Sequence, residues 1–332
     1  MKRSSVSSRT RNWLAPPSLA SVLAFWCALA AAQTPVIGFL NGASFELSAH
    51  LVRAFHQGLG ETGFVEGRNV AFEYRSAEGK YDRLPALATE LVKKRVDLIA
   101  ATGTPAGLPA KNATSTIPVV FVTGSDPIEQ GLVSNLSRPG GNVTGATTLA
   151  VELGKKRLEL LRELVSGATV IGVLLNPSGP NLETVTKDVT AAARSLHVEL
   201  QIVRASTVSE LEQAFAELAQ RRVHALVIGT DTFFNSQSAR LGALTRKYSL
   251  PAVYQYREFT AGGGLMSYAG SITDAYRVAG IYAGRILKGE KPAQLPVQQS
   301  SKAELFINVA TARALGIKVP QSILTRADEL IE

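Results

Sequence analysis

The chain has 332 residues, of which 45% are hydrophobic, and its 35 Lys and Arg against 27 Asp and Glu give a formal net charge of +8. Four basic residues and no acids lie in the first 32 residues, so the rest carries 31 − 27 = +4, too small an excess to indicate nucleic-acid binding. The single cysteine, Cys27, lies in the same segment, which excludes disulfides and thiol chemistry from the remainder. That remainder is long enough for two lobes with separate cores.

Residues 1–32 have the pattern of an export signal. A basic start without acids precedes an apolar run at residues 19–32, which is too short for a comfortable membrane span and ends in three alanines. We therefore expect a signal peptide at residues 1–32, cleaved after Ala32, and a protein located in the periplasm, with an uncleaved anchor as the alternative. The bulky residues before Cys27 argue against lipidation, and no later apolar run is long enough to span a membrane.

Strand and helix patterns alternate through the first half of the chain. A short apolar run at residues 36–40 is followed by Leu51, Phe55 and Leu59 at helical spacing, which indicates a strand and then a helix. Pro105 behind Thr104 is typical of a helix start. The expected strands are residues 36–40, 69–74, 96–100 and 119–122, and the expected helices are about 45–60, 81–94 and 104–112.

A turn cluster at residues 139–142 interrupts this alternation. It leads into Val143, Thr144 and Gly145, a run that we interpret as too short for a core strand and suited to a connection. We expect the chain to cross there to a second lobe.

The same alternation resumes beyond the crossing. Gly262 to Gly264 suggest a second connection, and residues 292–305 are expected to be extended and to cross a third time. The tail from Lys318 is expected to be peripheral. The expected strands here are residues 169–175, 198–203, 225–229 and 252–254, and the expected helices are 152–164, about 182–195, 209–219, 239–248, 273–287 and 310–315.

Strict alternation of strands and helices implies parallel sheets with helices on both faces. We therefore expect an α/β protein with two doubly wound parallel-sheet lobes joined by three crossings. The predicted first lobe comprises residues 33–145 and 268–292, and the predicted second lobe comprises residues 146–267 and 293–332.

Three runs of the sequence resemble a family of ABC-transporter substrate-binding proteins that includes tryptophan- and tyrosine-binding lipoproteins. The runs are TSTIPVVFVTGSDPIEQGLVSNLSRPGGNVTG at residues 114–145, a second run at residues 261–298, and FINVATARALGIKVP at residues 306–320. The resemblance implies a type I periplasmic-binding fold that closes around a small ligand, and an ABC permease in the inner membrane as partner. This chain lacks the lipidated cysteine of the lipoprotein members, which suggests a soluble periplasmic protein.

The strand-end loops are the expected ligand site, because loops at the carboxyl ends of parallel strands meet at one cleft. Gly103 allows close approach, and the helix starting at Thr104 offers unpaired N–H groups and a partial positive charge to a carboxylate. The alternative is that Thr104 only caps its own helix.

Asp126 and Asp231 are the expected partners of a ligand ammonium, although Asp126 also occupies a typical turn position before Pro127. Phe45 and Phe233 could stack on an apolar ligand side chain, although phenylalanine at helical spacing is more often core. The full expected set of ligand-binding residues is Phe45, Gly103, Thr104, Ser125, Asp126, Asn176, Asp231, Phe233, Tyr254 and Tyr268.

Catalytic motifs are absent from the sequence. There is no G-x-S-x-G, H-E-x-x-H or P-loop pattern, and the four histidines have no metal-ligand spacing. We expect no enzymatic activity, no catalytic residues, no cofactor, no metal and no nucleic-acid partner. The expected protein is a monomer that binds a small amino acid-like ligand with an aromatic or apolar side chain. A sugar ligand and a sensing module for a receptor remain alternatives.

Overall fold

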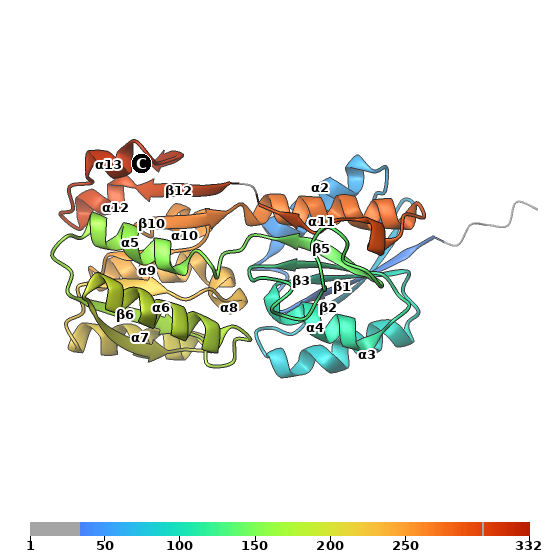
Figure 1. The fold of residues 1–332 in the computed structure, drawn as a ribbon, viewed down its shortest axis with the longest axis horizontal. Helices are drawn as coiled ribbons and strands as arrows, with labels where there is room; N and C mark the ends of the chain where they lie inside the picture. Colours follow the sequence, from blue (N-terminus) through green and yellow to red (C-terminus); the bar gives the residue numbers. More distant parts are fainter. Residues whose placement is uncertain (1–33, 301) are drawn as a thin grey trace, which may run out of the picture. The chain divides into compact units, whose positions relative to one another are not determined.

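Two separate sheets, each with helices on both faces, make up the part of the chain that the structure describes (Figure 1). This computed structural model describes residues 34–300 and 302–332, and the predicted signal peptide lies outside the described residues. Residues Pro35–Glu332 form one compact unit. None of the helices in these ranges is long and apolar enough to cross a membrane.

The first lobe is built on a parallel sheet in the order β11-β5-β4-β3-β1-β2. Successive strand residues face opposite sides, so Phe39 packs against α2 and α11 whereas Leu40 packs against α3 and α4. The strands are β1 Val36–Asn41, β2 Ala71–Ser76, β3 Leu98–Thr102, β4 Val119–Thr123, β5 Val143–Thr147 and β11 Gln298–Gln299. The helices are α2 Ala49–Glu61, α3 Leu84–Lys93, α4 Thr104–Ala113 and α11 Ile272–Leu287, with short 3-10 turns at Tyr81–Arg83 and Pro292–Gln294.

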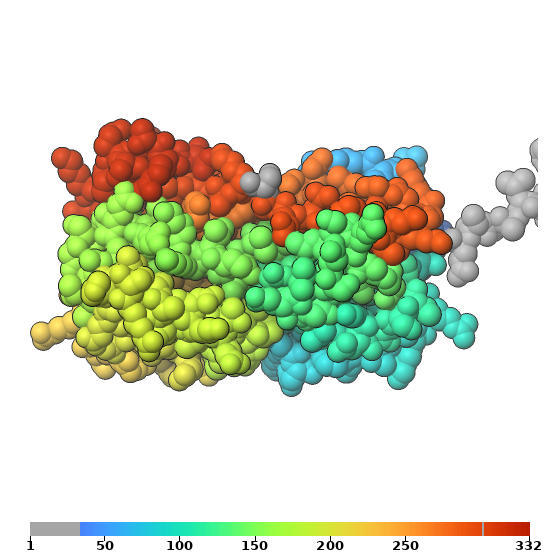
Figure 2. All heavy atoms as spheres, viewed as in Figure 1, coloured from blue at the N-terminus to red at the C-terminus, as the bar shows by residue number. Residues whose placement is uncertain are grey.

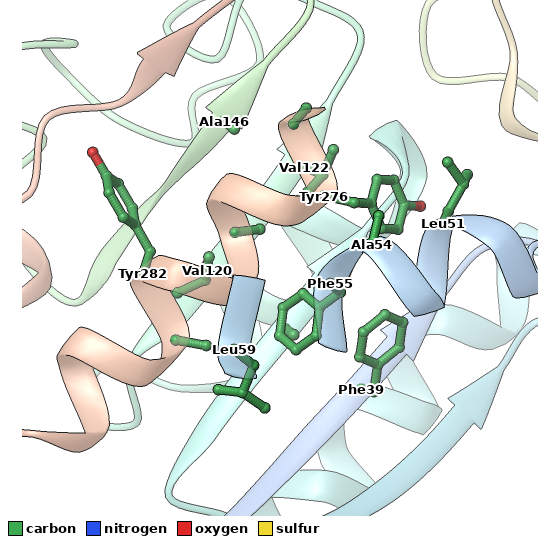
Figure 3. Packing of buried hydrophobic residues seen from close by; sticks show 14 of the residues in the cluster. Phe39, Leu51, Ala54, Phe55, Leu59, Val120, Val122, Ala146, Tyr276 and Tyr282 are labelled. Atoms are coloured by element: carbon green, nitrogen blue, oxygen red, sulfur yellow. The ribbon is translucent and has the colours of Figure 1, made fainter. Parts of the chain in front are cut away.

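Helix α11 returns to the first lobe from the far end of the sequence. Its Arg277 donates hydrogen bonds to Glu61 of α2, 216 residues away, and Figure 2 shows its orange atoms beside the blue and green atoms of this lobe. Figure 3 shows part of the core of this lobe, in which Phe55 of α2 lies beside Phe39 of β1 with ring centroids 5.1 Å apart.

The second lobe is built on a sheet in the order β13-β12-β10-β9-β8-β6-β7, in which only the β10–β12 pair is antiparallel among the described strands. Its strands are β6 Val170–Leu175, β7 Glu199–Arg204, β8 Ala225–Ile228, β9 Ala252–Tyr254, β10 Met266–Gly270, β12 Ala303–Asn308 and β13 Glu329–Ile331. Its helices are α5 Gly154–Leu164, α6 Leu182–Leu196, α7 Val208–Gln220, α8 Thr232–Ser236, α9 Ser238–Lys247, α10 Arg257–Ala261, α12 Val309–Ala314 and α13 Gln321–Leu324. The predicted fold class, two parallel-dominated α/β sheets, is confirmed.

The first connection lies later than predicted. Val143, Thr144 and Gly145 are buried in strand β5, which pairs with both β4 and β11. A Cβ at Gly145 would overlap the carbonyl oxygen of Phe121, so the glycine permits close approach inside a sheet and does not mark a connection. The chain leaves the first lobe after Thr147.

The other two connections also differ from the predicted boundaries. Gly262 and Gly263 close the end of α10 through hydrogen bonds to Glu258 and Thr260, and β10 then adds to the second sheet, so the chain crosses at Ser271. Residues 292–299 remain in the first lobe through β11, and the third crossing lies at about residue 300. The tail from Lys318 is also more than peripheral, because β13 extends the second sheet.

Candidate ligand-binding cleft

The carboxyl ends of strands from both sheets surround a shared cavity of about 30 Å³. Asn41 ends β1 and Gly103 follows β3 in the first lobe, whereas Asp231 follows β8 and Gln255 follows β9 in the second. A cavity of this size holds little more than water, so the lobes must separate before a larger molecule can enter. The geometry is that of a narrow cleft lined by both lobes.

The start of α4 lies at this cavity, but Thr104 does not act as its cap. The N-cap is Gly103 at φ 85°, a left-handed conformation that favours glycine. The Thr104 hydroxyl instead accepts hydrogen bonds from the N–H of Gly124 at 3.1 Å and the hydroxyl of Thr123 at 3.3 Å. These bonds tie the ends of β3 and β4 together, and they leave the positive end of the helix directed at the cavity.

Asp231 lines the cavity, but its Oδ1 already has several partners. This atom accepts hydrogen bonds from Phe233 N at 2.8 Å, Asn176 Nδ2 at 2.8 Å and Tyr81 Oη at 3.0 Å. Burial raises the pKa of Asp231, and these hydrogen bonds oppose the shift. Asp231 caps α8 through its hydrogen bond from Phe233 N. Because Tyr81 belongs to the first lobe, the same carboxylate also joins the two lobes.

All four aromatic residues of the predicted set lie outside the cavity lining. Phe233 is buried against Phe234 with ring centroids 5.6 Å apart, and the Tyr254 hydroxyl donates to the Asp231 carbonyl oxygen at 3.1 Å. Phe45 packs on Phe39 and Tyr74 in the first lobe, and Tyr268 packs on the core of the second.

Two tyrosines that the sequence analysis did not select line the cavity instead. Tyr256 follows β9 and shares a 2.8 Å hydrogen bond with the Thr148 hydroxyl, and Tyr276 projects from α11. Leu51 and Ile272 add apolar surface beside them. Tyr256 lies at a strand end, so the strand-end argument could have found it, but no sequence signal places a residue of α11 at the cleft.

Ser125 and Asp126 line a neighbouring cavity of about 360 Å³, which shares Thr104 with the first. Asp126 Oδ1 accepts from Ile128 N at 2.7 Å, which is the predicted turn role. Glu152, whose pKa burial raises, accepts from Asp126 N at 2.8 Å. Asn176 supports Asp231 and lines neither of these two cavities.

The charge of the central cavity is unevenly distributed. Glu258 and Asp231 line it from the second lobe, and His50 of α2 lies 3.4 Å from Glu258 across the cleft. No Lys or Arg among the described residues lines it. The described residues also contain no group of three or more His, Cys, Asp or Glu side chains able to hold a metal ion.

A buried arginine ties the connecting segments together at the base of the cleft. Arg157 donates to the carbonyl oxygens of Ala150 at 2.7 Å and Tyr268 at 3.3 Å, and to the Thr230 hydroxyl at 2.9 Å. Burial lowers its pKa to about 10, so the guanidinium stays charged at neutral pH. The sequence alone does not reveal the role of Arg157, because on α5 it resembles any basic residue of an exposed helix.

Comparisons with known proteins identify the family. A model of the ABC transporter substrate binding protein family matches residues 35–331. A tyrosine-binding protein of Clostridioides difficile is 28% identical over 267 residues, which cover 80% of this chain and 76% of that protein.

Solved structures agree with this match. The ABC domain from Streptococcus pneumonia in complex with L-Trp is 26% identical and aligns with a TM-score of 0.79, covering 90% of this chain and 100% of that one. A ligand-free, open substrate binding protein from Clostridium difficile aligns with a TM-score of 0.60 at 24% identity, covering 90% of this chain and 99% of that one. The protein therefore belongs to the family of ABC transporter substrate-binding proteins.

Proposed function

We propose that this protein captures a small amino acid with an aromatic or apolar side chain between its lobes and delivers it to an ABC permease in the inner membrane. The observation that carries the proposal is the narrow central cavity, which is lined by residues of both lobes. Closure around a ligand is the way in which two-lobed binding proteins capture solutes.

The lining suits a zwitterion with an apolar side chain. Glu258 and Asp231 offer negative charge to an ammonium, and the start of α4 offers its positive end to a carboxylate. Tyr256 and Tyr276 provide aromatic surface. Two similar proteins, one named as a tyrosine-binding protein and one solved in complex with L-Trp, favour the same class of ligand.

A sugar is the second candidate ligand. Solved structures with bound 5-methylthioribose and myo-inositol share the fold at 16% and 14% identity, a level that supports the fold alone. Polar residues such as Asn41, Asn235 and Gln255 line the cavity and could bind hydroxyl groups.

Binding can be tested by tryptophan emission without background from tryptophans of the protein itself. Both tryptophans, Trp13 and Trp26, lie in the predicted signal peptide, so the exported protein contains none. Addition of this protein to L-tryptophan should change the tryptophan emission, which comes only from the ligand. L-tyrosine should reverse the change by competing for the same site. A ligand at 100 times its dissociation constant should add about 2.7 kcal/mol to the free energy of unfolding.

Thermal unfolding of the protein in the presence of each ligand decides between an amino acid and a sugar. If amino acids leave the melting temperature unchanged while pentoses or hexoses raise it, the amino-acid assignment is wrong.

N-terminal sequencing of the periplasmic fraction tests export, for which we expect a chain beginning at Gln33. Deletion of the gene separates transport from sensing, because a transport protein is required for uptake of the amino acid and a sensing module is not.

A further inference from the structure

Two buried amides, one in each lobe, each have a polar atom without a hydrogen-bond partner among the described residues. The atoms are Nδ2 of Asn41 and Oε1 of Gln255, and each residue is only 1% exposed. Both residues line the central cavity. Unpaired buried polar atoms are uncommon and costly, so each one calls for an explanation.

The neighbours of each amide fix which atom is unpaired. Asn41 Oδ1 accepts from Ala43 N at 3.2 Å, and Gln255 Nε2 donates to Asn235 Oδ1 and to the Tyr254 hydroxyl. Asn41 therefore presents a free donor from the first lobe, and Gln255 presents a free acceptor from the second.

The charges around the cavity divide in the same way. The two acids of the lining, Asp231 and Glu258, belong to the second lobe, where Gln255 lies. The lining from the first lobe contains no acid among the described residues, and it includes Asn41 and the start of α4 at Gly103. A molecule with an acceptor at one end and a cationic donor at the other would complement both sides.

We propose that Asn41 and Gln255 together bind the head group of an α-amino acid. Asn41 Nδ2 donates to the carboxylate and Gln255 Oε1 accepts from the ammonium, so one head group bridges the lobes and satisfies both unpaired atoms. This inference rests on the proposed function and adds to it the orientation of the ligand, with the carboxylate toward the first lobe.

The test compares two ligands that differ only at the carboxylate. L-tyrosine and L-tyrosinamide are titrated by calorimetry into the wild type, Asn41→Asp, and the matched control Asn308→Asp. Asn308 is also a buried asparagine at the end of a strand, but it caps α12 and does not line the cavity. The unliganded melting temperature of each variant monitors folding, and Asn41→Ala replaces Asn41→Asp if the latter does not fold.

We expect Asn41→Asp to weaken L-tyrosine binding about tenfold or more and L-tyrosinamide binding much less, because only the carboxylate loses its donor and meets a negative charge. Gln255→Met should weaken both ligands about equally, since both carry the ammonium. Equal affinity of the wild type and Asn41→Asp for L-tyrosine would overturn the inference, as would equal losses for the acid and the amide. A wild type that binds neither L-tyrosine nor L-tryptophan would overturn the amino-acid function itself, and the inference with it.

Discussion

At the scale of single residues, the Tyr81 hydroxyl is a direct bond between the two lobes. It donates to Asp231 Oδ1 at 3.0 Å and accepts from Phe233 N at 2.8 Å. Tyr81→Phe removes both bonds but leaves Asp231 its partners within the second lobe. We expect ligand affinity to fall by about 0.5–1.5 kcal/mol, because the closed form loses stabilisation that the open form never had.

The control is Tyr74→Phe, which removes a hydroxyl that bonds to His56 and Glu66 within the first lobe, away from the cleft. Calorimetric titration of L-tyrosine checks the prediction. Equal affinity of Tyr81→Phe and the wild type would show that this bond does not contribute to closure.

The sequence predicted the site at this scale only in part. Gly103, Thr104 and Asp231 line the cavity, because strand ends can be read from apolar runs and the parallel fold brings those ends together. Which side chains of a strand-end loop turn inward could not be read, because loops have no hydrophobic period. Phe233 and Phe45 accordingly pack into the cores of their own lobes.

At the scale of elements, the contact between α2 and α11 depends on glycines that let the two helices approach closely. A Cβ at Gly58 would overlap the carbonyl oxygen of Arg277, and a Cβ at Gly280 would overlap that of Phe55. We expect Gly58→Ala to lower the free energy of unfolding by about 1–3 kcal/mol, because the helices must move apart.

Gly60 in the same helix provides the matched control, because a Cβ there would meet nothing within 4 Å. Gly60→Ala should be neutral or should raise the free energy of unfolding by up to about 1 kcal/mol through helix propensity. Urea denaturation of both variants checks the pair. A Gly58→Ala variant as stable as Gly60→Ala would contradict the close packing of these helices.

The C-terminal strand β13 is tied to the second lobe by an exposed ion pair. Glu329 accepts hydrogen bonds from Arg257 Nε at 2.8 Å and from Arg257 Nη2 at 2.5 Å. These two bonds lower the pKa of Glu329 below its ordinary value of 4.5. A lowered carboxyl pKa means that the contribution to stability is complete above about pH 4.5 and is lost as the pH falls through the lowered value.

Glu329→Gln should therefore lower the free energy of unfolding by about 0.5 kcal/mol at neutral pH, a small effect because water screens the pair. The difference from the wild type should vanish in strongly acidic solution. Thermal unfolding across this pH range, with Glu332→Gln as control beyond the end of β13, measures it. A difference that grows toward low pH would contradict the assignment.

The sequence predicted most elements but misread the connections. Helical and alternating periods placed the helices and strands within a few residues, because burial against a core imposes those periods. Strand β5 was misread because Val143, Thr144 and Gly145 form a short run behind a turn cluster, although their burial is decided by strands β4 and β11 on either side. Pairing between segments distant in sequence leaves no local signal.

At the scale of the whole molecule, the two lobes have largely separate cores, which is the architecture that hinge closure about the three connections requires. The lobes touch through the hydrogen bond from the Tyr81 hydroxyl to Asp231 Oδ1 at 3.0 Å. The central cavity of about 30 Å³ is too small for exchange of an amino acid without opening.

The unliganded protein should therefore be more open in solution than its complex, since a few connecting residues can absorb the change in backbone dihedral angles. We expect the radius of gyration from small-angle X-ray scattering to fall when saturating L-tyrosine is added, with D-glucose as the control ligand. Tyr81→Phe should close less completely at the same saturation, because it lacks the bond to Asp231 that only the closed form makes. An unchanged radius of gyration under conditions in which calorimetry shows full occupancy would exclude hinge closure as the mode of capture.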